Sequence, residues 1–414
     1  MNEYVSVADA QYKILDAFSP TNSETITIEA AHHRVLAEDI FSSMDLPAFA
    51  NSSMDGYAVR AQDVINANPQ NPIQLQVVAD IPAGYSGDAT LTTGQAARIM
   101  TGAPIPAGSN AVVPVEFTDL DRRDQTGLLN KQVMVYKPVE NGDFIRPAGQ
   151  DIKSGELVLT SKSYLRAQDV ALLAMLGISD IRVFRQPRVA IFSSGDELLP
   201  VNASLTPGKI HDSNTYMIVS LVEDYGGRAI NLGIAEDSFE SVQDIFERGL
   251  AEKVDLIISS AGVSVGVYDY VRSVLEKNGE LGFWRVNMRP GKPLTFGQYR
   301  NTPFIGLPGN PVSAFVGFEV FIRPVLLKLG GIEDWRRPMV RVKIEDPIES
   351  DGRESFLRAV VREREGTWLG RLTGHQGSGN LHSLVQANAL FLIPSGVKSL
   401  PIGSEVNAWL FNNC

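Results

Sequence analysis

The chain has 414 residues, a formal net charge of −11 at pH 7 and a single cysteine, Cys414. Its acidic balance argues against binding to nucleic acid or to an anionic membrane surface, because both need a basic protein surface. One cysteine excludes an intrachain disulfide and a cysteine-cluster metal site.

The length predicts about two to four domains, at about 100–200 residues for each. No segment approaches the roughly 20 apolar residues of a membrane helix. The N-terminal sequence also lacks the basic start of a signal peptide. We therefore expect a cytoplasmic protein that does not enter a membrane.

Two segments with helical periodicity enclose a segment of a different kind. Residues 6–19 and 163–178 have apolar positions three and four apart, as amphipathic helices do. Between them, residues from about 46 to 145 are rich in Pro, Gly, Val and Thr and contain short alternating runs, which predict strands. We predict an N-terminal helical and β domain made of residues 1–45 and 146–181, with a β-rich domain of residues 46–145 inserted in it.

Strands and helices alternate from Pro187 onward. The expected order is strand 188–194, helix 213–227, strand 228–234, helix 238–252, strand 254–260 and a helix from about Tyr268. Such alternation predicts a mostly parallel sheet covered by helices, with ligands at the carboxyl ends of the strands. Pro311 suits the first position of the last helix, and Pro324 is expected to kink or end it. We assign residues 182–329 to this α/β domain.

The last part of the chain contains short strands from about residue 338 onward. We assign residues 330–414 to a small C-terminal β domain. The predicted fold class is therefore multidomain α/β plus β.

A glycine and serine loop follows the third strand of the alternating unit, in the stretch IISSAGVSVGVYDYV, residues 257–271. Backbone amides of such a loop and the start of the next helix converge on one position, which favours an anion such as phosphate. The loop is not a Walker loop, because no Gly-Lys-Ser/Thr follows it. Glycine and serine are also common in purely structural turns, which is the alternative interpretation.

Positive charge enters the α/β domain in the stretch FWRVNMRPGKPLTFG. If residues 284–289 are extended, Arg285, Asn287 and Arg289 share one face and the apolar residues between them share the other. The two arginines would then lie about 13 Å apart at roughly 3.3 Å per residue, so they would hold different anionic groups. Lys292 follows three residues later. The alternative is an edge strand whose charges only prevent aggregation.

Carboxylates follow each of the first three strands of the alternating unit. Asp196 and Glu197 come after the first strand, Glu236 and Asp237 after the second, and Asp269 after the third. Each alone fits a helix cap. Together, at one edge of the sheet and facing an anion loop, they predict an oxygen-ligand site for Mg²⁺ that bridges to phosphate.

The chain resembles the molybdopterin molybdenumtransferase family, the bacterial MoeA type that is related to the E domain of gephyrin. The resemblance rests on segments in unbroken order: NSSMDGYAVR, TGAPIPAGSNAVVPVE, RPAGQDIKSGELVL, SSGDELL, HDSNTYM, GVSVGVYDYV, RPGKP and GLPGNPVSAF. It implies insertion of molybdate into adenylyl-molybdopterin with release of AMP. It also implies an elongated N-terminal domain, a three-layer MogA-like α/β domain, a barrel-like C-terminal domain, a homodimer with clefts between subunits, and a MogA-type molybdopterin adenylyltransferase as pathway partner.

The resemblance also implies which residues form the site. The catalytic residues would be Asp55, Thr101, Glu197, Asp237 and Asp269, with Mg²⁺ held by Glu197, Asp237 and Asp269. The substrate-binding residues would be Arg146, Asp151, Asp212, Ser213, Asn214, Gly262, Ser264, Gly266, Arg285, Arg289, Lys292, Pro308, Pro311, Arg358 and Ser378. Among these, Arg358 and Ser378, with Arg289 nearby, are the expected donors to molybdate.

The chain departs from the family pattern at a few positions. The family usually has lysine where this chain has Arg285 and Arg289, so a planar fork replaces a compact ammonium. Gln150 stands where an acidic residue is frequent, and Ala261 stands where glycine is usual. Two alternatives stay open: a homologue that inserts tungstate, which has nearly the same size and charge as molybdate, and a non-catalytic dimeric scaffold of the gephyrin E-domain type.

Overall fold

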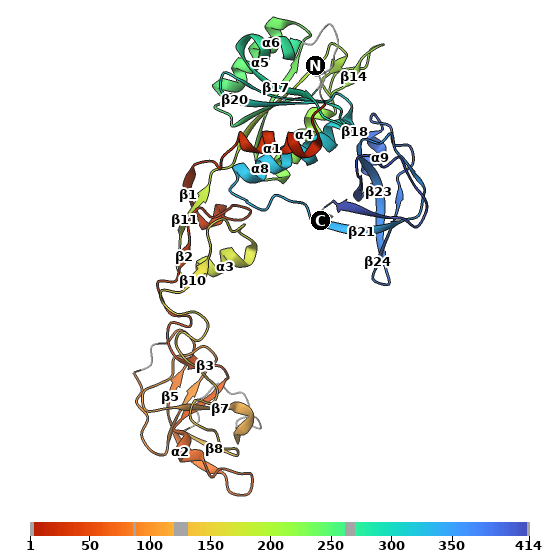
Figure 1. Cartoon of the computed structure of the whole chain (residues 1–414). Helices are drawn as coiled ribbons and strands as arrows, with labels where there is room; N and C mark the ends of the chain where they lie inside the picture. The colour runs from red at the N-terminus through yellow and green to blue at the C-terminus, as the bar shows by residue number, and fades with distance from the viewer. Residues whose placement is uncertain (1–3, 86–87, 120–130, 261–269, 412–414) are drawn as a thin grey trace. The chain divides into compact units, whose positions relative to one another are not determined.

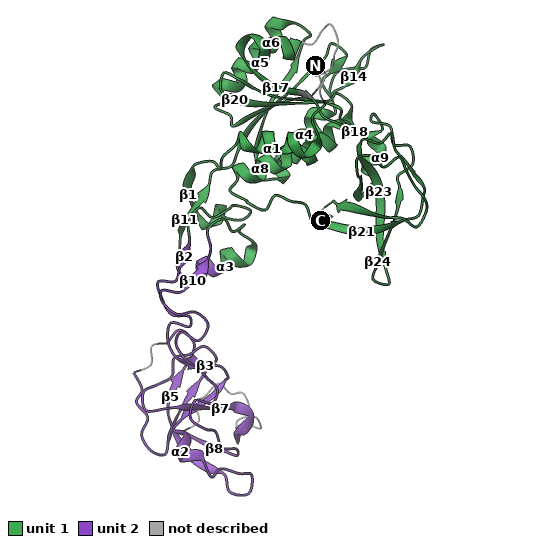
Figure 2. Ribbon diagram, in the orientation of Figure 1, with its two compact units in different colours: residues 1–38, 161–171, 179–414 green, residues 39–160, 172–178 purple. Residues whose placement is uncertain are grey.

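The computed structural model describes residues 4–85, 88–119, 131–260 and 270–411. The chain forms two compact units (Figure 2). The first contains residues 1–38, 161–171 and 179–414, and the second contains residues 39–160 and 172–178. This division is coarser than the four predicted domains, which stay a prediction. No helix in the described part of the chain is long and apolar enough to cross a membrane.

The second unit is built on a five-stranded sheet, as the alternating runs of its sequence predict. Its strands lie in the order β7 (Ala111–Pro114), β4 (Gly56–Val59), β6 (Gln95–Ile99), β5 (Ile73–Ile81) and β8 (Gln132–Val135). Two-stranded pairs join β3 (Asn51–Ser52) to β9 (Ile145–Arg146) and β2 (Ile40–Phe41) to β10 (Leu157–Leu159), and short helices are α2 (Ala61–Val64) and η2 (Val115–Phe117).

Gly56 shows why the sequence MDGYA has glycine after Asp55. A Cβ at Gly56 would lie 2.0 Å from the backbone oxygen of Val113, on the neighbouring strand β7. Any side chain there would therefore push β4 and β7 apart. The close approach fixes the strand that follows directly after Asp55.

A six-stranded sheet forms the centre of the first unit. Its order is β15 (Arg228–Ala235), β12 (Arg188–Ser194), β16 (Leu256–Ser260), β20 (Thr302–Leu307), β19 (Pro293–Tyr299) and β17 (Gly279–Arg285). The first four strands are parallel, β19 runs antiparallel to β20, and β17 runs antiparallel to β19. The mostly parallel sheet that the alternating pattern predicts is therefore confirmed.

Helices cover both faces of this sheet, because side chains alternate along each strand. On β12, Val189 and Ile191 face one core cluster, while Ala190 and Phe192 face another. The first cluster includes side chains of α1 (Val7–Asp16), α4 (Asn214–Asp224), α7 (Pro311–Gly317) and α8 (Arg323–Leu329), and the second includes those of α5 (Phe239–Ala251) and α6 (Tyr270–Asn278). Figure 1 shows α1, α4 and α8 on one side of the sheet and α5 and α6 on the other. The result is the expected three-layer α/β arrangement.

The helical run after β20 begins as predicted but continues past its second proline. Pro311 occupies the first turn of α7. A π-helical segment, Phe318–Ile322, separates α7 from α8, and Pro324 lies in the first turn of α8. The α-helical pattern thus breaks just before Pro324, which cannot donate a backbone hydrogen bond, and then resumes to Leu329.

The C-terminal strands close into a small barrel, as the family resemblance implies. The barrel strands are β23 (Glu354–Arg364), β24 (Thr367–Leu372), β21 (Met339–Ile344), β27 (Glu405–Leu410) and β25 (Ala389–Ile393), and β25 pairs back with β23. Smaller elements are β22 (Ile348–Glu349) with β26 (Ser399–Leu400), and α9 (Leu381–Val385). Elsewhere in the first unit, β1 (Ser23–Thr27) pairs with β11 (Asp180–Phe184), β13 (Leu198–Leu199) pairs with β14 (Ile210–His211), and η1 (Ile28–Ala30) is a short helix. Helix α3 (Ala167–Met175) has residues in both units.

The single extended strand expected over residues 284–289 is wrong. Strand β17 ends at Arg285, and β18 (Met288–Arg289) pairs instead with β23 of the barrel. Between the two strands, Val286 forms an isolated parallel bridge with Val5. The expected alternation still holds, since Val286 and Met288 are fully buried while the two arginines are half-buried.

Candidate functional site

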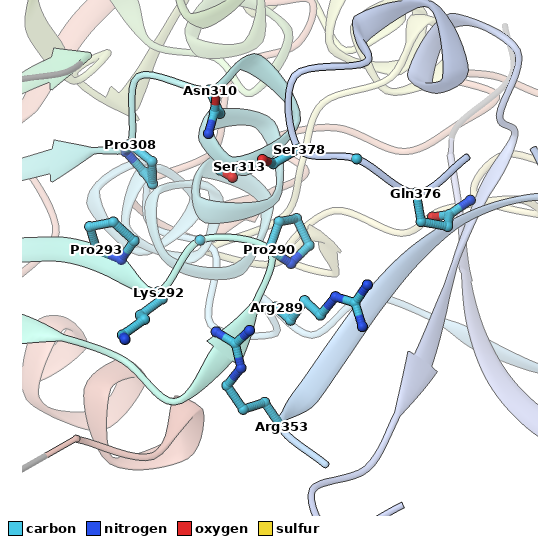
Figure 3. Close-up of a pocket in the computed structure, with 12 residues that line it drawn as sticks. Arg289, Pro290, Lys292, Pro293, Pro308, Asn310, Ser313, Arg353, Gln376 and Ser378 are labelled. Atoms are coloured by element: carbon cyan, nitrogen blue, oxygen red, sulfur yellow. The ribbon is translucent and has the colours of Figure 1, made fainter. Parts of the chain in front are cut away.

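A pocket of about 360 Å³ lies where the barrel meets the α/β sheet within the first unit (Figure 3). Four segments line it: residues 289–293, residues 308–313 at the start of α7, Arg353 just before β23, and residues 376–378. Of the expected site residues, it brings together Arg289, Lys292, Pro308 and Ser378. Pro311 lies beside it as the first residue of α7.

Local sequence explains how these segments take their places. Gly291 has φ +103°, a left-handed backbone conformation that favours glycine and lets the RPGKP segment turn sharply. The backbone amide of Val312 donates to the carbonyl of Ser378 at 3.0 Å, which ties the 376–378 loop to the start of α7. Ser313, also in the lining, is buried.

The pocket is electropositive. Arg289, Lys292 and Arg353 contribute three positive side chains, and the described residues that line the pocket include no carboxylate. Serine hydroxyls of Ser313 and Ser378 add neutral donors. Such a donor set suits a small oxyanion, because arginine and lysine supply charge-assisted hydrogen bonds.

Arg358 lies behind the pocket wall and is fully buried. Its guanidinium donates to the hydroxyl of Ser383 at 3.1 Å and to the carbonyls of residues 375–377 at 2.9–3.3 Å. Burial, and after it the nearby positive charge of Arg289, lowers the pKa of Arg358 to about 10. Arg358 thus holds the loop that carries Ser378 in place. Direct contact between Arg358 and molybdate stays a prediction.

Tyr4 is a neighbour of the pocket that the sequence did not indicate. The backbone of Val5 pairs with Arg285 and Asn287, through hydrogen bonds of 3.2 and 2.8 Å. This pairing places the ring of Tyr4 5.0 Å from Nζ of Lys292. A hydrogen bond from Lys292, together with the charges of Lys292 and Arg285, lowers the pKa of Tyr4.

Carboxylates gather at the carboxyl ends of β12 and β15, as predicted. The backbone amide of Asp237 donates to Oδ1 of Asp196 at 3.1 Å. Burial raises the pKa of Asp237, and the charges of Asp196 and Glu197 raise it further, against a backbone hydrogen bond that lowers it. Carboxylate oxygens of this kind are the ligands that a divalent cation such as Mg²⁺ prefers. Within the described residues, however, no three acidic, histidine or cysteine side chains form a complete metal cluster.

The DSN segment organises the start of α4. Asp212 accepts from the backbone amide of Thr215 at 3.1 Å and from its hydroxyl at 2.6 Å, and Ser213 is the N-cap. Asn214 donates to the hydroxyl of Ser260 and to the carbonyl of Gly309, both at 2.7 Å. Its Oδ1 is buried and has no partner in the part of the chain that is described. A buried acceptor of this kind usually has a donor, so it marks a place for one.

The remaining expected residues lie outside this region. Asp55 and Thr101 belong to the second unit, where the amide and hydroxyl of Thr101 donate to Oδ1 of Asp55 at 2.7 and 2.8 Å and lower its pKa. Arg146 and Asp151 form a 2.5 Å ion pair in the same unit. Gly262, Ser264, Gly266 and Asp269 lie outside the described residues.

These features define a multidomain protein whose α/β domain and small barrel share an oxyanion-type pocket. Three family models match the chain in order: the MoeA N-terminal region (domains I and II) over residues 5–177, a probable molybdopterin-binding domain over residues 190–328, and the MoeA C-terminal region (domain IV) over residues 341–411.

Full-length relatives agree with these matches. The chain is 39% identical to the molybdopterin molybdenumtransferase of Nostoc sp., over 94% of this chain and 88% of the relative. It is 37% identical to molybdopterin molybdenumtransferase 2 of Mycobacterium tuberculosis strain H37Rv, over 98% and 99%. A crystal structure of the molybdopterin biosynthesis MoeA protein from Pyrococcus horikoshii matches with a TM-score of 0.83 and 32% identity, over all of both chains. The chain therefore belongs to the MoeA family.

Proposed function

We propose that this protein is a molybdopterin molybdenumtransferase, which inserts molybdate into adenylyl-molybdopterin and releases AMP to give molybdenum cofactor. The observation that carries the proposal is the pocket lined by Arg289, Lys292 and Ser378, in a chain of this family. Molybdate is a small dianion, and a pocket with cations and hydroxyls but no lining carboxylate among its described residues suits it.

The chain's own residues divide the work. Arg289 and Lys292 bind the oxyanion by charge, and Arg358 holds the loop that presents Ser378. Asp212, Ser213 and Asn214, with Gly262, Ser264 and Gly266, bind the adenylyl-molybdopterin at the carboxyl ends of the strands. Arg285 and the pair Arg146 and Asp151 bind further anionic or polar groups of this substrate.

Glu197, Asp237 and Asp269 would hold Mg²⁺. When bound, Mg²⁺ supplies positive charge that offsets the negative charge developing on the adenylate phosphate. Asp55 and Thr101 complete the catalytic set. The hydrogen bonds from Thr101 keep Asp55 ionised and fix its orientation, so that it can act as an acceptor for a substrate donor.

The direct test uses the full-length protein with adenylyl-molybdopterin, molybdate and Mg²⁺. We expect release of AMP and formation of a cofactor that activates a molybdenum-dependent apoenzyme, and we expect both to stop when EDTA removes Mg²⁺. Tungstate in place of molybdate distinguishes the tungstate-inserting alternative. Absence of AMP release with both oxyanions would favour the non-catalytic scaffold of the gephyrin type.

The protein would work in the cytoplasm as a homodimer, after a MogA-type adenylyltransferase has made its substrate. If Asp55 of one subunit serves the pocket of the other, a mixture of Asp55→Ala and Lys292→Ala chains should regain up to about a quarter of the parent activity in mixed dimers. This recovery is measured after unfolding and refolding the two variants together, because subunits must exchange. A monomer mass in light scattering at micromolar concentration would refute the dimer. A mixture no more active than its parts would refute a site shared between subunits.

A further inference from the structure

Arg353 is a pocket residue that no family motif discussed above includes. It lies one residue before β23, and Figure 3 shows it reaching from the barrel toward the segment that carries Arg289 and Lys292. Its Nη1 donates to the carbonyl of Met288 at 3.0 Å. The parallel pairing of β18 with β23 places Arg289 opposite Ser355, so two arginines meet at this edge of the pocket.

Asp351 occupies the other side of the Arg353 guanidinium. Its Oδ2 accepts from Nε at 3.0 Å and from Nη2 at 2.5 Å, and its Oδ1 accepts from the backbone amide of Arg353 at 3.1 Å. Gly352 between them has φ +87°, a left-handed conformation that permits this short turn. The two charges are therefore placed by the local Asp-Gly-Arg sequence itself.

The carboxylate of Asp351 is ionised and lies close to the positive charges of the pocket. The hydrogen bonds from Arg353 lower the pKa of Asp351, and the charge of Arg289 also contributes. Asp351 thus carries its negative charge next to two pocket arginines, although it is not itself in the pocket lining. An oxyanion in the pocket would be attracted by the arginines and repelled by this carboxylate.

We infer that Arg353 is a third oxyanion-binding residue and that Asp351 is an internal counter-ion that weakens oxyanion binding by competing for the same guanidinium. The inference rests on the proposed molybdate site. The Asp351–Arg353 side chains are 41% and 32% exposed, so the guanidinium can exchange one partner for the other without opening the protein core. The pair would limit affinity, so that the oxyanion is held weakly enough to leave the pocket for the substrate.

The test measures binding of sodium molybdate to the full-length protein by titration calorimetry at constant ionic strength. Arg353→Ala is expected to weaken binding about tenfold, the effect of losing one charge-assisted donor. Asp351→Asn is expected to tighten binding about three- to fivefold, because it removes the carboxylate that competes with the oxyanion for the Arg353 guanidinium. The double variant should bind like Arg353→Ala alone, because Asp351 acts through the shared guanidinium.

Matched controls separate these effects from general charge. Glu349→Gln removes an exposed carboxylate from the neighbouring strand β22, and Arg341→Ala removes an exposed barrel arginine that pairs with Glu405. Neither should change the affinity by more than about twofold, since exposed charges are screened by salt. Arg353→Lys, which keeps the charge but loses the fork, replaces Arg353→Ala if the latter does not fold.

Parent-like binding by Arg353→Ala and Arg353→Lys would overturn the inference. Weaker binding by Asp351→Asn would overturn the counter-ion role. A loss of affinity is the result expected if the carboxylate only holds Arg353 in place. The same titrations with inorganic phosphate separate this inference from the proposed function. If the variants bind phosphate with the expected order of affinities and molybdate does not bind, the molybdate proposal fails and the inference about Arg353 and Asp351 is supported. If the parent binds neither anion, both fail.

Discussion

Alanine in place of Arg289 is expected to lower kcat/KM for molybdate about a hundredfold, because losing a charge-assisted donor in a partly desolvated pocket costs on the order of 2–3 kcal/mol. Arg289 lines the pocket from one side, and its positive charge is near enough to lower the pKa of both Arg358 and Asp351. Its effect on the oxyanion should therefore exceed that of a single surface charge.

Arg289→Lys tests the departure from the family pattern. Lysine keeps the charge but cannot offer paired planar donors, so we expect a loss of about tenfold rather than a hundredfold. Both variants should melt within about 2 °C of the parent, because a half-exposed charge contributes little to folding. Steady-state kinetics with varied molybdate and a thermal melt measure the two effects.

Arg341→Ala is the matched control, since this arginine lies on the barrel with its side chain 78% exposed. It should leave kcat/KM unchanged. If Arg289→Ala and Arg289→Lys both turn over molybdate as the parent does, the segment after β17 is a charged edge with no role in the reaction.

The faces of the α/β sheet could be predicted from local sequence, whereas the pocket could not. The run RVAIFSS predicts a buried strand with side chains on both faces, and β12 has that form. The pocket, by contrast, depends on β18 pairing with β23, two segments far apart in the chain. Nothing near Arg353 in the sequence indicates that it will lie beside Arg289. That part of the site required the three-dimensional structure.

For two charged residues, the surrounding sequence indicates burial, which we did not predict. Arg358 lies inside the apolar run SFLRAVV, and Glu319 lies inside FVGFEVFI. A charge in such a run is buried only when it is paired or fully hydrogen-bonded. The run around Arg358 therefore indicated an arginine that is hydrogen-bonded by protein groups, as observed.

The partner of Glu319 could not be found in the same way. Arg337 lies in the segment between α8 and β21, where an arginine would ordinarily be exposed. In the structure its Nη2 bonds Oε2 of Glu319 at 2.6 Å and the hydroxyl of Tyr225 at 2.6 Å, while Nη1 donates to the carbonyl of Leu410 at 2.8 Å. This cluster joins the helical run of the α/β domain to the last strand of the barrel.

Glu319→Gln is expected to lower the free energy of unfolding by about 3–5 kcal/mol, the cost of leaving one member of a buried ion pair without its partner. The side chains of Arg337 and Glu319 are only 5% and 3% exposed, so water cannot solvate the Arg337 guanidinium once the carboxylate is lost. Burial already raises the pKa of Tyr225 to about 12, so its hydroxyl stays neutral and offers no substitute anion. Urea unfolding followed by tryptophan fluorescence measures the loss.

Two further variants decide whether the uncompensated charge is the cause. Glu405→Gln breaks the exposed pair with Arg341 on the same barrel and should cost less than about 1 kcal/mol. Glu319→Leu combined with Arg337→Met replaces both charges by apolar groups and should recover most of the stability lost in Glu319→Gln. If the double variant is less stable than Glu319→Gln, the hydrogen bonds to Tyr225 and Leu410 matter more than the charge. If Glu319→Gln unfolds at the same urea concentration as the parent, the ion pair does not hold the barrel to the α/β domain at all.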